Sequence, residues 1–224
     1  MGRSPEVQSN LQLRRARPGD APFLAWAILS ASRGHLSRGT WDFIWGFEED
    51  ELLEFLEYLV LSETPHWCHH SRFLVAETGA GEPIAALSAF APEIDGPQAL
   101  GPVALQAATD FGLSGAELLE SFGNANAVRD AVPAYRPDVW AIENVACLPE
   151  YRGVGIVGRL LQRAKSEGLA RGFTKLQANV FSDNVVAQQA YRKSGFELDE
   201  ELTSSVLKEQ LGTQGMQRFL LAVN

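Results

Sequence analysis

The chain has 224 residues, of which 46% are hydrophobic and 21% charged, enough for one globular domain with a substantial core. Its net charge of −9 and pI near 5.0 argue against a nucleic-acid surface, which needs clustered Lys and Arg. Only two cysteines and no apolar run of membrane-spanning length argue against a disulfide framework and a membrane protein. We therefore expect a cytoplasmic protein.

The first part of the chain predicts a strand, two helices and a hairpin. Residues 1–10 are polar and aperiodic, which indicates a flexible N-terminus ahead of a single domain over residues 11–224. The expected elements are a strand at 11–15, a helix opened by Pro18-Gly19-Asp20, a loop at 32–39, a helix at 48–59, and a hairpin with strands at 73–75 and 84–90.

The helix at 48–59 is amphipathic and acidic. Leu52, Phe55, Leu56 and Leu59 recur at helical spacing, with Asp and Glu residues around them. Such a run of acids is typical of a solvated face that also suits a helix N-terminus. It mildly favours a cationic substrate as the alternative.

Three histidines and a cysteine lie within the five residues from His66 to His70. These side chains are zinc ligands in principle, but a structural zinc site usually takes paired ligands from two separated segments. No second such cluster occurs in the sequence. We therefore predict no metal and interpret the segment as a loop before a strand.

The second part of the chain predicts an insertion followed by a βαβα unit and two strands. The insertion covers residues 93–138 and contains two helical patches, at 116–122 and 125–131. The later elements are a strand at 139–148, a helix at 155–171 stopped by Gly172, a strand at 175–181, a helix opened by Asp183 or Asn184, and strands at 196–202 and 216–223.

A Gly-rich turn joins the strand at 139–148 to the following helix. Gly153, Gly155 and Gly158 allow positive φ and close approach of a ligand to the backbone. The free N–H groups of the first helical turn favour a phosphate, and Arg152 adds a positive charge. The turn is therefore a candidate anion site.

This turn also fits the dinucleotide pattern G-x-G-x-x-G, so a Rossmann fold is the rival interpretation. Against it, residues 149–152 separate the strand from the first glycine, and no acidic residue ends the next strand. A Walker A loop is excluded because no Gly-Lys-Ser/Thr follows.

The segment from Glu143 to Phe196 resembles the core of the GCN5-related N-acetyltransferase (GNAT) superfamily. The resemblance rests on Val145-Ala-Cys-Leu-Pro-Glu-Tyr-Arg-Gly-Val-Gly155, then Asn184-Val-Val-Ala187, Tyr191 and Gly195-Phe196. It implies an α/β fold with a mixed, mostly antiparallel sheet that opens between its fourth and fifth strands. It also implies acetyl-CoA as co-substrate and a small-molecule or peptide amine as acceptor, and a homodimer is a candidate assembly.

The resemblance assigns roles to particular residues. It implies Glu143 as the base and Tyr191 as the acid that protonates the CoA thiolate, although an ordinary polar contact for Glu143 and a core position for Tyr191 remain open. We also weigh Cys147 as a nucleophile, and His35 and Trp41 as acceptor-pocket residues. The implied cofactor-binding residues are Val145, Ala146, Cys147, Arg152, Gly153, Val154, Gly155, Ile156, Val157, Gly158, Asn184, Ala187 and Tyr191.

One residue departs from the family pattern. The R-x-x-G-x-G/A motif has a small residue where this chain has Val157. We expect the Val157 side chain to point away from the phosphates. The predicted activity is direct acetyl transfer from acetyl-CoA to a primary amine, and the alternative is a non-catalytic acyl-CoA-binding or regulatory module.

Overall fold

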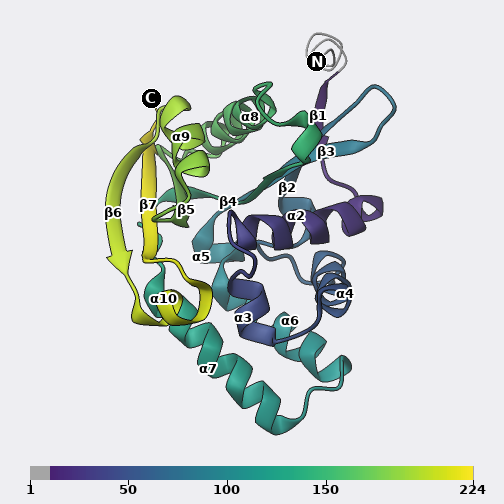
Figure 1. The fold of residues 1–224 in the computed structure, drawn as a ribbon. Coiled ribbons are helices and arrows are strands. Elements are labelled where there is room, and N and C mark those ends of the chain that lie inside the picture. Colours follow the sequence, from purple (N-terminus) through teal and green to yellow (C-terminus); the bar gives the residue numbers. More distant parts are fainter. Residues whose placement is uncertain (1–10, 224) are drawn as a thin grey trace.

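The computed structural model describes residues 11–223, so the predicted flexible segment at 1–10 lies outside the described residues. Its centre is a seven-stranded sheet with the order β1-β2-β3-β4-β5-β7-β6 (Figure 1). The strands are β1 Gln12–Arg15, β2 Phe73–Glu77, β3 Pro83–Phe90, β4 Val139–Cys147, β5 Lys175–Phe181, β6 Glu197–Thr203 and β7 Gly215–Ala222.

The sheet is mixed and mostly antiparallel, as expected. Neighbouring strands run antiparallel, with the exception of β4 and β5, which pair in parallel from Val139 with Lys175 to Ile142 with Ala178. A Rossmann fold needs a predominantly parallel sheet. The strand directions therefore reject the dinucleotide-binding alternative.

Helices cover both faces of the sheet. Figure 1 shows α8 and α9 on one side, and α2, α3, α4, α6 and α7 on the other. The helices are α2 Ala21–Arg33, α3 Thr40–Trp45, α4 Glu49–Val60, α5 Pro92–Asp95, α6 Pro97–Asp110, α7 Gly115–Ala131, α8 Ile156–Ala170, α9 Val185–Lys193 and α10 Ser205–Leu211.

The apolar core consists of two clusters, one on each face. Alternate residues of β5, Leu176, Ala178 and Val180, pack with Leu160 and Leu161 of α8 in the first cluster. The second cluster joins α2, α4 and α6 to β2. All four predicted apolar residues of the acidic helix are fully buried in that second cluster. The period-2 and period-3.6 patterns thus identified the core faces correctly.

The segment between β3 and β4 differs from its prediction. The two expected helical patches form one continuous helix, α7, which runs through Gly123 and packs against α3 and α10. The sequence did not predict α6, which contains Pro102 in its interior. Buried Ala104, Ala107 and Ala108 pack α6 into the core, so tertiary packing overrides the local cost of the proline.

Candidate active site

A cleft opens where β4 and β5 stop pairing. Their ladder ends at Ile142 and Ala178, and the strands beyond this point border a cavity of about 1210 Å³. Residues 143–147 of β4 line one wall, and residues 179–181 of β5 line the other. The start of α8, the helix α9 and the loop after α2 complete it. The unpaired strand edges leave backbone groups available to a ligand.

A β-bulge in β4 shapes the middle of this cleft. Ala146 pairs with Ala86 and Glu143 pairs with Ser88, so β4 carries one extra residue there. Asn144 adopts the left-handed conformation with φ 54°, which Asn tolerates better than most residues. Its Nδ2 donates a hydrogen bond to Ser88 Oγ at 3.0 Å. The bulge re-aims the backbone directly after Glu143.

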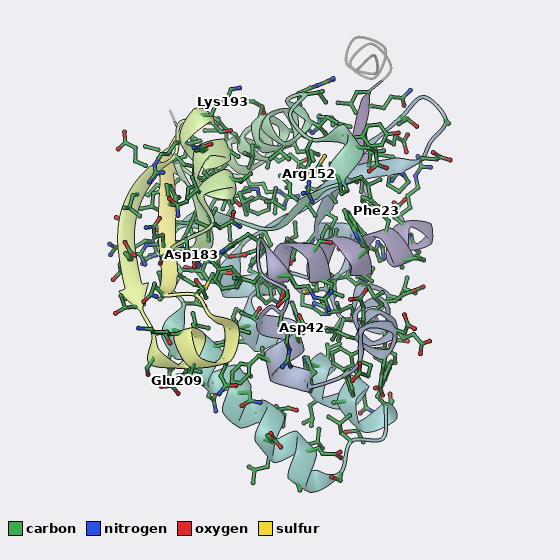
Figure 2. All side chains as sticks on the ribbon, viewed as in Figure 1. Phe23, Asp42, Arg152, Asp183, Lys193 and Glu209 are labelled. Atoms are coloured by element: carbon green, nitrogen blue, oxygen red, sulfur yellow. The ribbon has the colours of Figure 1, made fainter. Side chains whose placement is uncertain are left out.

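The Gly-rich turn after β4 presents open backbone to the cleft. Gly153 and Gly155 have φ of 80° and 85°, and a Cβ at either position would meet no atom within 4 Å. Gly155 is the N-cap of α8, and no side chain caps the helix. The exposed Arg152 (labelled in Figure 2) donates from Nε to the Cys147 carbonyl at 3.0 Å. The predicted anion site therefore has the required form: open glycines, an uncapped helix start and a cation.

Glu143 of β4 is among the residues that line the cleft. It receives a hydrogen bond at Oε1 from the Tyr135 hydroxyl at 3.0 Å. Burial raises the pKa of Glu143 to about 8, and the bond from Tyr135 partly opposes this rise. The carboxyl group can therefore exchange a proton near neutral pH, which suits a general base.

Tyr191 belongs to α9, which borders the cleft. Its ring stacks on Phe219 with centroids 6.1 Å apart and is 6% exposed, while the residue still lines the cleft. Burial, and secondarily the charge of Glu143, raise the pKa of Tyr191 above its usual range. The hydroxyl group is therefore protonated at neutral pH and can act as a proton donor.

These features agree with the sequence comparison. A sequence model of the acetyltransferase (GNAT) family matches residues 36–196. The chain belongs to the acetyltransferase (GNAT) family. The predicted family and enzyme class, a GNAT-type N-acetyltransferase, are thereby confirmed.

Solved structures share the fold of this GNAT chain at low identity. One crystal structure of an acetyltransferase is 20% identical, with TM-score 0.67, and covers 95% of this chain and 100% of the other. The acetyltransferase yncA of Salmonella typhimurium, solved with acetyl-CoA, has 15% identity, TM-score 0.52 and coverages of 96% and 95%. The polyamine N-acetyltransferase of Drosophila melanogaster has 17% identity, TM-score 0.54 and coverages of 96% and 100%.

Almost all residues predicted to bind the cofactor of this GNAT chain lie along the cleft. Val154 is outside the lining and packs against the core beside α8. Asn184 uses its Oδ1 to cap α9, accepting from Ala187 N at 3.1 Å. The lining residues from the prediction are Val145, Ala146, Cys147, Arg152, Gly153, Gly155, Ile156, Val157, Gly158, Asn184, Ala187 and Tyr191.

Val157 has two surroundings. Its half-buried side chain packs against the core, and the residue also lines the cleft. It occupies the first turn of α8, the helix for which Gly155 is the N-cap. The core contact provides an apolar environment for the bulky side chain that departs from the family pattern. That Val157 points away from the phosphates remains a prediction.

The weaker site hypotheses fare differently. His35 and Trp41 both line the cleft, and His35 Nε2 lies 3.3 Å from Asp183 Oδ1. Burial raises the pKa of Cys147 to about 11, so little thiolate exists at neutral pH and nothing favours a nucleophilic role. Buried His66 accepts a hydrogen bond from Cys68 N, and no group of three metal-ligating side chains occurs among residues 11–223.

The acidic helix α4 lies away from the GNAT cleft. No residue of α4 is in the described lining, in which Glu143 is the one carboxylate. The acids of α4 thus give no support to a cationic acceptor. In the described part of the chain, no helix has the length and apolar character to cross a membrane.

Sequence reasoning missed two residues that shape this site. Asn144 is a polar residue inside a strand pattern, which is the one linear sign of a bulge. Tyr135 lies in the segment before β4, where no periodicity connects it with Glu143. Only the folded chain brings its hydroxyl group to the carboxylate.

Proposed function

We propose that this GNAT chain transfers the acetyl group of acetyl-CoA to a primary amine by direct attack. One observation carries the proposal. A single cleft is bordered by a carboxyl group whose pKa is raised to about 8, a protonated tyrosine and an open Gly-rich helix start, contributed by Glu143, Tyr191 and the turn 152–158. These are the groups that proton removal, proton donation and phosphate binding require.

The residues of the cleft fit acetyl-CoA in two respects. The open backbone at Gly153 and Gly155, next to the uncapped start of α8, would hold the pyrophosphate, with Arg152 adding charge. The unpaired edge of Val145–Cys147 would align the pantetheine arm by strand-like hydrogen bonds, because β5 no longer pairs there. The S. typhimurium relative was solved with acetyl-CoA, which supports this donor.

The proposed proton transfers use Glu143 and Tyr191, which both line the cleft. Glu143 removes a proton from the ammonium form of the acceptor, directly or through water, and the neutral amine forms a C–N bond at the thioester carbonyl. A backbone N–H of Val145–Cys147 stabilises the charge that develops on the carbonyl oxygen. As the C–S bond breaks, Tyr191 donates its proton to the CoA thiolate. The attacking nitrogen then gives its second proton to the Tyr191 phenolate, directly or through water, and Glu143 returns its own proton to the solvent. The products are the acetylated amine and CoA.

A thiol-release assay tests the proposal. Purified protein is mixed with acetyl-CoA and a panel of primary amines, and free CoA is followed with a thiol reagent. We expect amine-dependent CoA release that Glu143→Gln lowers about 100-fold or more, while binding of acetyl-CoA persists. The protein would instead be the non-catalytic module if it bound acetyl-CoA without turnover on any amine, and if neither Glu143→Gln nor Tyr191→Phe changed the rate of CoA release.

A further inference from the structure

We propose that Tyr135 is a positioning residue for Glu143, presented to it by an anchored loop at residues 132–138. The proposal rests on the proposed function, in which Glu143 is the base. It starts from one contact, the hydrogen bond that the Tyr135 hydroxyl donates to Glu143 Oε1 at 3.0 Å. Tyr135 is not among the residues that line the cleft, whereas Glu143 is. The tyrosine therefore contacts Glu143 without belonging to the cleft lining.

The loop that carries Tyr135 is held by three hydrogen bonds from two side chains of β5. Asn179 Nδ2 donates to the Pro133 carbonyl at 3.1 Å, and Gln177 Nε2 donates to the Ala134 carbonyl at 3.2 Å. Gln177 Oε1 accepts from the backbone N of Arg136 at 2.8 Å. Because these bonds flank Tyr135 on both sides, they fix the backbone from which its ring projects.

A buried arginine strengthens the same anchor. Arg218 of β7 is 3% exposed, and its Nη1 donates to the Ala134 carbonyl at 2.7 Å. Its charge is matched by Asp199 at 2.6 Å and Glu200 at 2.6 Å on β6. A buried ion of this kind is costly unless it is paired and hydrogen-bonded. A loop that only connected two elements would not need a buried polar network bonded to its backbone. This network therefore indicates that the loop is held in a defined position.

The hydrogen bond from Tyr135 uses only one of the two carboxylate oxygens of Glu143. Tyr135 occupies Oε1, and no described residue is hydrogen-bonded to Oε2, which remains for the acceptor amine. The donated bond favours the charged carboxylate and so opposes the effect of burial. Tyr135, Tyr191 and Cys68 are the titratable neighbours whose own pKa values respond to the charge of Glu143.

The alternative is that Tyr135 only fills space. Its ring packs edge-on against Phe90, with centroids 5.9 Å apart. Tyr135→Phe separates the two roles, because it keeps the ring and removes the hydroxyl donor. Tyr58→Phe is the matched control, since Tyr58 also donates to a carboxylate, Asp110 at 2.8 Å, but on the surface of α4 and outside the cleft lining.

Carbon-13 NMR of protein labelled at the glutamate carboxyl carbon tests the proposal without turnover. Glu143 is assigned by loss of its resonance in Glu143→Gln, and its titration is then compared in the wild type, Tyr135→Phe and Tyr58→Phe. We expect Tyr135→Phe to raise the midpoint by about one pH unit and Tyr58→Phe to leave it unchanged. An unchanged or lowered midpoint in Tyr135→Phe overturns the proposal.

The pH dependence of turnover provides the second readout. In Tyr135→Phe we expect the limb of the kcat profile that reports the base to move to higher pH in parallel with the NMR midpoint, with the KM for acetyl-CoA unchanged. A moved NMR midpoint with an unmoved kcat profile overturns positioning for catalysis. Full activity of Glu143→Gln would overturn the proposed base instead, so the two failures are distinguishable.

Discussion

Asn144 Nδ2 donates a hydrogen bond to Ser88 Oγ across the bulge that separates Glu143 from Val145–Cys147 on the unpaired edge of β4. Ser88 is fully buried, so this bond fixes Asn144 in its left-handed conformation from inside the sheet. The bulge follows directly after Ile142, the last residue of β4 that pairs with β5. The backbone of Asn144 therefore lies where the cleft opens.

Replacing Asn144 should separate backbone strain from the hydrogen bond. We expect Asn144→Ala to lower the free energy of unfolding by about 1–3 kcal/mol, because Ala pays for positive φ and leaves Ser88 without its donor. Asn144→Gly loses the same bond without the φ penalty, so it should be the milder change. Urea denaturation of both variants measures the difference. Equal losses would contradict a contribution from φ.

The stability of the protein should depend on the pH through Glu143. Burial raises its pKa in the folded state to about 8 from the ordinary 4.5. Between these values the folded protein keeps a proton that the unfolded chain releases, so the contribution of Glu143 to stability is highest below about pH 4.5 and falls as the pH rises to about 8. Each pH unit corresponds to about 1.4 kcal/mol at most, and exposure to the cleft should reduce the total to about 1–3 kcal/mol.

Glu143→Gln provides the measurement. Glutamine does not titrate, so the variant should lack the loss of stability that the Glu143 carboxyl group causes. Urea unfolding at pH 5 and at pH 9 should therefore show that, relative to the wild type, the variant is more stable at pH 9 than at pH 5. The comparison cancels the contributions of all other titrating groups that the two proteins share. Parallel pH profiles for the two proteins would show that the carboxyl group is ionised throughout.

Tyr191 should affect turnover much more than folding. Tyr191→Phe retains the stacking on Phe219 and the edge contact with Phe196 and removes the hydroxyl group alone. As the proposed acid for the thiolate, its loss should lower kcat by about 100-fold with the KM for acetyl-CoA unchanged. Steady-state kinetics and thermal unfolding of the same preparation measure both effects. An unchanged kcat would assign Tyr191 to the core only.

Much of the fold was predictable because it depends on local patterns. Alternation in Lys175–Phe181 gave a strand with those bounds, and the glycines after β4 gave the open turn. Asn184 as an N-cap follows from its hydrogen-bonding chemistry, and the structure has that cap. These features are decided within a few residues, so the sequence alone specifies them.

The remaining features depend on segments that are distant in the sequence. The hydrogen bond from Tyr135 to Glu143 exists because Gln177 and Arg218 hold the loop before β4. Both of these residues lie more than forty positions further along the chain than the loop residues that they bind. The continuity of α7 similarly depends on tertiary contacts, including Asn124 Nδ2 to the Phe43 carbonyl at 3.1 Å. No local periodicity contains such information, which explains why these parts escaped prediction.

The lining of the cleft predicts the kind of amine that it accepts. Glu143 is the one carboxylate among the described lining residues, while Trp41, Trp67 and Phe181 contribute aromatic surface. The second cation of a polyamine would find no carboxylate there, whereas an aromatic or apolar body would be desolvated favourably. We expect kcat/KM for 2-phenylethylamine to exceed that for spermidine by about tenfold. A preference for spermidine would require acids outside this lining, such as Asp183.

A single methyl group at Gly158 should stabilise the protein and weaken its binding of acetyl-CoA. Gly158 lies in the first turn of α8 without positive φ, and a Cβ there would meet no atom within 4 Å. Alanine should therefore raise the free energy of unfolding by about 0.5–1 kcal/mol. The same methyl group would enter the space that we propose for the pyrophosphate. We expect the Kd for acetyl-CoA to rise about tenfold.

Gly123→Ala is the matched control for this change. Gly123 also lies within a helix, α7, and has equally open surroundings, but it is absent from the lining of the cleft. It should show a similar gain in stability with no change in affinity for acetyl-CoA. Urea unfolding and isothermal titration calorimetry on the wild type and both variants measure the two quantities. Unaltered affinity in Gly158→Ala would place the pyrophosphate away from the start of α8, because the added methyl group would collide with a ligand bound there.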